Sequence, residues 1–218
     1  MNDWTIWQLA DSALPSGGFA HSAGLEASFQ AGEVTGEKTL DRFLADSLWQ
    51  AGRAMLPFVT SAHRNPSRLE DLDASCDAFL TNAIANRASR VQGRAFVSAC
   101  LRIWPSAAVE SLDDRTRGLC GHHAPVFGAG LALLGVPRET AQRMAMFTTS
   151  RGILAAAVRL GIVGPYRAQR LHHETGSLVD EVLVRCASLT DDEVSQTAPL
   201  IDVLQMSHDR LYSRLFQS

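Results

Sequence analysis

Residues 84–99 read IANRASRVQGRAFVSA, and this stretch decides the class of fold. Its apolar residues recur every three or four positions, a spacing that places them on a single face of one helix. The face is predicted to consist of Ile84, Ala88, Val91, Ala95 and Ala99. No alternation of apolar and polar residues interrupts the stretch, so a β-strand is not expected here.

The same helical pattern extends outward over the rest of the chain. A second helix is predicted to carry Leu40, Leu44, Leu48, Ala51 and Met55 on one face. Pro57 should end or kink this helix. Residues 153–158 are apolar all round, as in a helix that is packed on every side. Proline, glycine and asparagine breakers separate segments of ordinary helix length and leave no long linker. We therefore predict one all-α domain over residues 1–218, a bundle of about eight to ten helices.

The composition excludes several classes of function. The chain has 20 basic and 23 acidic residues, so it lacks the basic surplus of a nucleic-acid-binding protein. Only Lys38 among the basic residues is a lysine, and residues 32–39 around it come nearest to a P-loop. Glu37 stands there where the motif requires a glycine. A self-contained P-loop nucleotidase is therefore excluded, and no nucleic-acid partner is expected.

No segment is expected to enter a membrane. The chain begins MNDW, without the basic and apolar regions of a signal peptide. Its longest apolar stretches are far shorter than the roughly 20 residues that span a bilayer. The four cysteines are scattered and form no C-x-x-C pair, which is typical of a chain that is kept reduced. These features predict a cytoplasmic protein.

Residues 11–26, DSALPSGGFAHSAGLE, are the least ordinary part of the sequence. Pro15 should stop the first helix, and Gly17 and Gly18 permit backbone angles that other residues avoid. Within the segment, the side chains of Phe19 and Leu25 are expected to be buried. Those of His21, Ser22 and Glu26 are expected to point elsewhere. Two interpretations stay open: a tight helix–helix turn, or a glycine-rich anion loop that lacks the usual cation.

Two adjacent histidine pairs, His122-His123 and His172-His173, are the candidates for a metal site. With Cys120 they could offer ligands for nickel or zinc. Adjacent residues on a helix point about 100° apart, however, so neither pair can chelate as histidines four residues apart would. We therefore expect no metal site and no cofactor, and His122 and His123 are only weak candidates.

No catalytic residues are predicted. A G-x-S-x-G elbow is absent from the sequence, and an all-helical chain lacks the strand on which that elbow is built. Cys120 and a nearby histidine could serve a small helical hydrolase, although catalytic pairs are assembled by the fold rather than by adjacency. That enzyme remains an alternative.

Residues 199–218 suggest a surface for a partner. Their apolar positions are expected to share one face of a helix: Leu200, Leu204, Leu211 and Leu215, flanked by Val203 and Tyr212. Such a helix could dock on its own core, or it could enter a groove of another protein. We favour the second interpretation and predict a partner-binding segment.

Four parts of the sequence resemble the urease accessory protein F family, in the expected order along nearly the whole chain. The most specific is Leu14-Pro15-Ser16-Gly17-Gly18-Phe19, with His21-Ser22 and Gly24-Leu25-Glu26 after it and Ala31-Gly32 further on. The supporting elements are Pro125-Val126-Phe127-Gly128, Arg159-Leu160-Gly161 with Gly164, and Leu211-Tyr212-Ser213-Arg214-Leu215-Phe216.

The resemblance implies an all-helical homodimer without catalysis of its own. Members of that family bind a D- or H-type accessory protein and a nickel-carrying G-type GTPase, and the complex inserts nickel into urease apoprotein. We expect the partner-binding residues in the two end segments: Gly17, Gly18, Phe19, His21, Ser22, Glu26, Leu204, Leu211, Tyr212, Arg214, Leu215 and Phe216. A generic helical adaptor unrelated to nickel is the remaining alternative.

Overall fold

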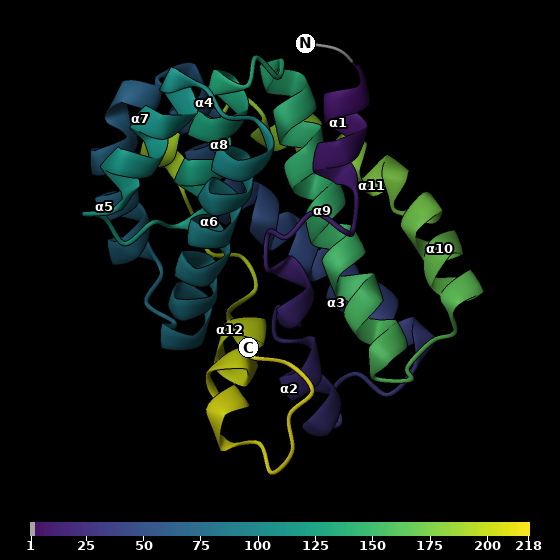
Figure 1. The fold of residues 1–218 in the computed structure, drawn as a ribbon. Coiled ribbons are helices and arrows are strands. Elements are labelled where there is room, and N and C mark those ends of the chain that lie inside the picture. Colours follow the sequence, from purple (N-terminus) through teal and green to yellow (C-terminus); the bar gives the residue numbers. More distant parts are fainter. Residues whose placement is uncertain (1–2) are drawn as a thin grey trace.

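A computed structural model describes residues 3–218, and within them the chain forms helices and turns without a β-strand (Figure 1). This confirms the predicted all-α class. The α-helices are α1 (Asp3–Ala10), α2 (Leu25–Gln30), α3 (Glu37–Gln50), α4 (Leu56–Arg64), α5 (Leu69–Phe79), α6 (Ala83–Ile103), α7 (Ala107–Thr116), α8 (His123–Leu133), α9 (Arg138–Arg159), α10 (Pro165–Glu174), α11 (Gly176–Cys186) and α12 (Pro199–Met206). Short 3₁₀ turns cover Gly18–Ala20, Pro66–Arg68, Asp191–Glu193 and His208–Arg210.

Two hydrophobic clusters form the interior. The first gathers around α4 to α8 and includes Phe58 and Phe96, and the second gathers around α3, α9, α10 and α11 and includes Leu48 and Ile153. Figure 1 shows these two groups of helices, with α2 and α12 side by side at one end of the molecule. A cavity of about 1230 Å³ lies between the clusters and is lined by residues of both.

The buried face of α6 differs in part from the prediction. Val91 is 44% exposed, whereas Phe96 is buried. The helix turns this other side toward the segment that leads into α8, because Gly93 allows the two backbones to touch. A Cβ at Gly93 would lie 2.1 Å from the carbonyl oxygen of Gly121. The pattern of apolar residues could not predict this contact, because the contact depends on glycine having no side chain.

Pro57 does not end the helical run that begins with α3. A π-helical turn over Ala51–Met55 connects α3 to α4, and the proline lies in the first turn of α4. Proline removes the N–H group that would otherwise bond to the carbonyl four residues earlier, here that of Arg53. The N–H group of Ser195 donates to this carbonyl instead, at 3.1 Å. The loop before α12 therefore satisfies the acceptor that the proline leaves free.

Gly128 lets α8 lie directly on α4. A Cβ at this position would lie 2.3 Å from the carbonyl oxygen of Val59, a backbone atom that cannot rotate away. Close packing of this kind tolerates extra volume poorly. The glycine of the Pro125–Gly128 element is thus explained by helix packing.

We predict that Gly128→Ala lowers the free energy of unfolding by about 1–3 kcal/mol, because the helices must separate to admit the methyl group. Gly152→Ala in α9 is the matched control, since a Cβ there would have no neighbour within 4 Å. That substitution should raise the free energy of unfolding by about 0.5–1 kcal/mol through helix propensity. Urea denaturation of both variants provides the comparison, and equal effects would contradict the close contact.

Candidate functional site

The carboxylate of Glu26 fixes the C-terminal segment to α2. Glu26 is 1% exposed, and its Oε1 accepts a hydrogen bond from the N–H group of Leu215 at 2.7 Å. Its Oε2 accepts from the N–H group of Phe216 at 3.2 Å and lies 3.0 Å from Nε2 of His208. A buried carboxylate is tolerated when its oxygens are hydrogen-bonded in this way. Glu26 therefore joins residues that are nearly 190 positions apart in the sequence.

The residues just before α2 pair with the last residues of the chain. The N–H group of Ser22 donates to the backbone oxygen of Ser218 at 2.7 Å, and the Ser22 hydroxyl donates to the same oxygen at 3.0 Å. Nδ1 of His21 lies 2.6 Å from Oγ of Ser218. Burial, together with the charge of Arg87, lowers the pKa of His21 and favours its neutral ring.

Arg159, at the end of α9, contacts both the glycine turn and the C-terminal segment. Its guanidinium group lies over the rings of Phe19 and Phe216, at 4.3 and 4.1 Å from their centroids. It also donates to the carbonyl oxygens of Phe19 at 2.8 Å and Leu215 at 3.1 Å. Cation–π contacts and charge-assisted hydrogen bonds thus act on one side chain. We call the contacts of Glu26 and Arg159 with the C-terminal segment the end junction.

The burial expected in residues 11–26 was wrong except at Leu25. Phe19 is 68% exposed, whereas His21, Ser22 and Glu26 are buried. The reason is the C-terminal segment, which covers the polar side chains and supplies their hydrogen-bond partners. Phe19 stays outside this cover and rests on Arg159. No pattern within residues 11–26 could predict that the other end of the chain packs over these side chains.

The turn itself favours a structural interpretation over an anion loop. Gly17 has a φ of +76°, which confirms the need for glycine there, whereas Gly18 begins a 3₁₀ turn. The N–H groups of Ala20 and His21 donate to the carbonyls of Gly17 and Gly18. These donors are therefore used within the turn and do not converge on an open anion site.

The predicted single helix face of residues 199–218 was also wrong. Helix α12 ends at Met206, so Leu211 and Leu215 lie beyond it, in irregular chain. Phe216 is buried against the second cluster, while Tyr212 is fully exposed and Leu215 is 60% exposed. Arg214 pairs with Asp209 at 3.2 Å. The segment is thus anchored by its backbone and by buried side chains such as Phe216 and His208, while Tyr212 and Leu215 point outward.

The exposed apolar side chains of this region form what we call the C-terminal apolar set: Phe19, Leu200, Val203, Met206, Tyr212 and Leu215. Leu204 and Leu211 are partly buried. Apolar side chains of this kind mark a protein-binding surface where they join into one large patch. The partner-binding surface expected here stays a prediction, and the sequence analysis missed the contacts of Arg159 and His208.

Comparison with known proteins places the whole arrangement in context. The sequence model of the UreF family matches residues 34–176. The chain belongs to the UreF family. Urease accessory protein F of Arabidopsis thaliana is 39% identical over 221 residues, which cover 99% of this chain and 92% of that protein. Its counterpart in Oryza sativa subsp. indica is 38% identical, covering 98% of this chain and 84% of that protein. Urease accessory protein UreF of Mycobacterium tuberculosis H37Rv is 32% identical over 211 residues, with 96% of each chain covered.

Three of the family-like elements quoted from the sequence meet in the end junction of this UreF-family chain. They are the glycine turn, Arg159 of the Arg-Leu-Gly element, and the final Leu211–Phe216 element. In the described residues, no helix combines the length and apolar character needed to cross a membrane.

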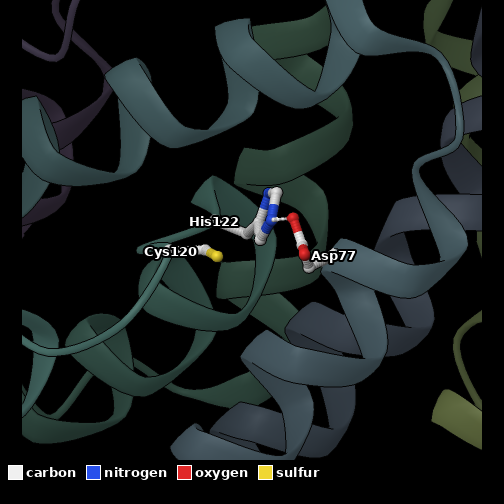
Figure 2. A group of neighbouring side chains, drawn as sticks. All are labelled: Asp77, Cys120 and His122. Carbon is white, nitrogen blue, oxygen red and sulfur yellow. Dashed lines mark hydrogen bonds and ion pairs between the residues drawn. The ribbon is translucent and has the colours of Figure 1, made fainter.

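The two weak metal candidates have different surroundings. His122 is buried, with Nε2 at 3.0 Å from Oδ1 of Asp77 and Nδ1 at 3.1 Å from Oγ of Ser89. Figure 2 shows His122 directed toward Asp77, with Cys120 beside them. His123 instead packs against Phe96 and Phe127, with ring centroids 6.2 and 5.2 Å away. Asp77 was missed because nothing in the sequence relates α5 to residues 120–122.

The same geometry disfavours a cysteine hydrolase. A nucleophilic cysteine needs a lowered pKa and a histidine nitrogen that is free to accept its proton. Burial and the nearby carboxylate of Asp77 raise the pKa of Cys120. Both ring nitrogens of His122 already face other partners, Asp77 and Ser89. The arrangement therefore lacks the features of an activated thiolate.

We predict that His123 makes the fold sensitive to mild acid. Burial lowers the pKa of His123 from 6.5 to about 4, so stability is complete above pH 6.5 and is lost as the pH falls toward 4. The loss should reach about 1–3 kcal/mol, since His123 is partly exposed and lines the cavity, where water would screen the charge. His123→Phe keeps the aromatic packing and should flatten this part of the stability profile. Unfolding measured at pH 7.5 and pH 5 tests this, and an unchanged pH dependence in the variant would contradict it.

A second prediction concerns the glycine turn. Gly17→Ala should lower the free energy of unfolding by about 1–2 kcal/mol, because the left-handed conformation crowds a Cβ. The added methyl group would otherwise fit, with Ala95 at 3.5 Å as its nearest neighbour. Gly18→Ala adds the same atom where φ is not positive and should change stability by less than about 0.5 kcal/mol. Thermal unfolding separates the two, and equal losses would show that φ is not the cause.

Proposed function

We propose that this chain is a non-catalytic accessory protein of urease maturation. The relatives at 32–39% identity are named urease accessory proteins, and they match nearly the whole chain. The observation that carries the proposal is the end junction. It gathers three separate family-like elements and holds exposed apolar side chains in place. A preorganised surface of this kind suits binding, because its ordering entropy is lost on folding rather than on association.

The partners we propose are a D- or H-type accessory protein, a G-type GTPase and urease apoprotein. In this scheme the complex inserts nickel into urease in the cytoplasm and couples GTP hydrolysis to metal transfer. The phosphate-binding lysine would belong to the GTPase, which is consistent with the isolated Lys38 of this chain. The C-terminal apolar set would contact the D- or H-type protein.

The chain would act as a homodimer. Trp4 and Trp7 on α1 are 69% and 65% exposed, and their rings lie 6.4 Å apart. Tryptophan is enriched at the centres of protein interfaces, where its large apolar surface is removed from water. This pair supports an interface on α1 that is separate from the C-terminal apolar set.

Two alternatives are less well supported. The hydrolase that would use Cys120 and a histidine conflicts with the raised pKa of that thiol. A generic helical adaptor would share the fold but would have no effect on urease. Activation of urease therefore distinguishes the proposed function from the adaptor.

We predict that Tyr212→Ser combined with Leu215→Ser abolishes partner binding but leaves the fold intact. Both side chains are largely exposed, so the free energy of unfolding should change by less than about 0.5 kcal/mol. Loss of two apolar anchors should nevertheless weaken an interface by several kcal/mol. The test measures co-purification with the D-type accessory protein and urease activity in cells that supply nickel. Cells without this chain set the baseline.

The matched control is Tyr166→Ser combined with Val184→Ser. These side chains are 94% and 85% exposed and lie on α10 and α11, outside the C-terminal apolar set. The control should bind the D-type protein and support urease activation normally. If the two double variants behave alike, the docking surface lies elsewhere on the chain. If cells lacking the chain activate urease fully, the proposed function itself is wrong.

A further inference from the structure

We propose that Asp77, Cys120 and His122 form a binding site for a divalent transition-metal ion of the Zn²⁺ or Ni²⁺ type. One carboxylate oxygen, the thiol sulfur and one imidazole nitrogen lie within 4.8 Å of one another (Figure 2). This inference goes beyond the proposed function, because it concerns an ion held by the chain itself. It also revises the expectation from sequence that no metal site exists.

The spacing of the three atoms fits one small ion. Metal–ligand distances of about 2.0–2.3 Å in a tetrahedral site place neighbouring ligand atoms roughly 3.3–3.8 Å apart. Nε2 of His122 and Oδ1 of Asp77 are now 3.0 Å apart and share a hydrogen bond. An ion would replace the proton between them, and the side chains would separate by less than about 1 Å to admit it.

The donor set selects the class of ion. Thiolate and imidazole ligands favour borderline-soft ions such as Zn²⁺ and Ni²⁺ over Mg²⁺ or Ca²⁺, which prefer oxygen alone. The carboxylate of Asp77 and the thiolate of Cys120 would together balance the two positive charges. The pKa of Cys120 is raised in the free protein, but the bound ion provides the free energy to remove the proton.

The backbone that carries two of the ligands is held firmly. The buried carboxylate of Asp73 accepts hydrogen bonds from the N–H groups of Gly121 at 3.2 Å and His122 at 2.7 Å. Gly121 has a φ of +73°, a left-handed conformation between Cys120 and His122, whose ligand atoms lie near each other. Residues two positions apart on a regular helix would not face each other in this way.

Two further side chains orient the ligands. Oγ of Ser89 lies 3.1 Å from Nδ1 of His122, which leaves Nε2 directed at the site. Nδ2 of Asn86 donates to Oδ1 of Asp77 at 2.9 Å. Partners of this kind fix the tautomer and the direction of metal ligands. Asp77 is 43% exposed, so solvent can reach the site and supply a fourth ligand.

The test is titration of the purified, metal-stripped full chain with ZnCl₂, followed by isothermal calorimetry. We expect one ion per chain, and a tenfold or greater loss of affinity in both Cys120→Ser and Asp77→Asn. Ser89→Ala should weaken binding about tenfold without changing the stoichiometry. His173→Ala removes an exposed histidine outside the site and should bind as the unaltered chain does.

Co²⁺ provides a readout that a purely structural hydrogen bond would not give. Thiolate ligation should produce a charge-transfer absorption band that disappears in Cys120→Ser and persists in His173→Ala. Thermal unfolding without metal confirms that each variant is folded, and if Asp77→Asn unfolds, the Cys120→Ser spectrum alone decides. Absence of saturable binding, or binding that Cys120→Ser leaves unchanged, would overturn the proposal.

Discussion

The buried carboxylate of Glu26 is the interaction on which the arrangement of the two chain ends depends. It accepts two backbone hydrogen bonds from the C-terminal segment and faces His208 from within the fold. A carboxylate left buried without such partners would cost several kcal/mol, so α2 and the C-terminal segment stabilise each other. Glu26 thereby helps to hold the C-terminal segment over His21 and Ser22, whose own hydrogen-bond partner is Ser218.

The end junction also connects the candidate binding surface to the core. Arg159 is the last residue of α9, the long helix that crosses the second hydrophobic cluster, and it holds both Phe19 and Phe216. A partner that moves either end of the chain would therefore act directly on α9. Such coupling requires no distant pathway, since the two segments contact the same side chain.

The proposed metal site and the end junction are formed by different helices. The first is built on α5, α6 and the turn before α8, whereas the second is built on α2, α9 and the residues after α12. Among the ion pairs found in residues 3–218, one links the helices of the metal site to the C-terminal segment, and it joins Arg87 of α6 to Asp209. We therefore expect that substitutions can alter the proposed metal binding and the proposed partner binding separately.

The sequence by itself determined the helical class and most of the interruptions between helices, and it pointed to the two end segments as the candidates for binding. These follow from local rules: helical periodicity, the fixed φ of proline, and the need for glycine at a positive φ such as that of Gly17. Resemblance to the accessory protein family added the expected partners. None of these rules extends beyond a few residues along the chain.

Only the tertiary structure decided which side chains are buried and which are brought together. Phe19 was expected inside and Glu26 outside, and the opposite holds because residues 208–218 cover one and not the other. Asp77 joined Cys120 and His122 only through the packing of α5 against the turn before α8. The physical reason is common to both cases: burial and ligand geometry depend on contacts between distant segments, and local sequence patterns carry no information about such contacts.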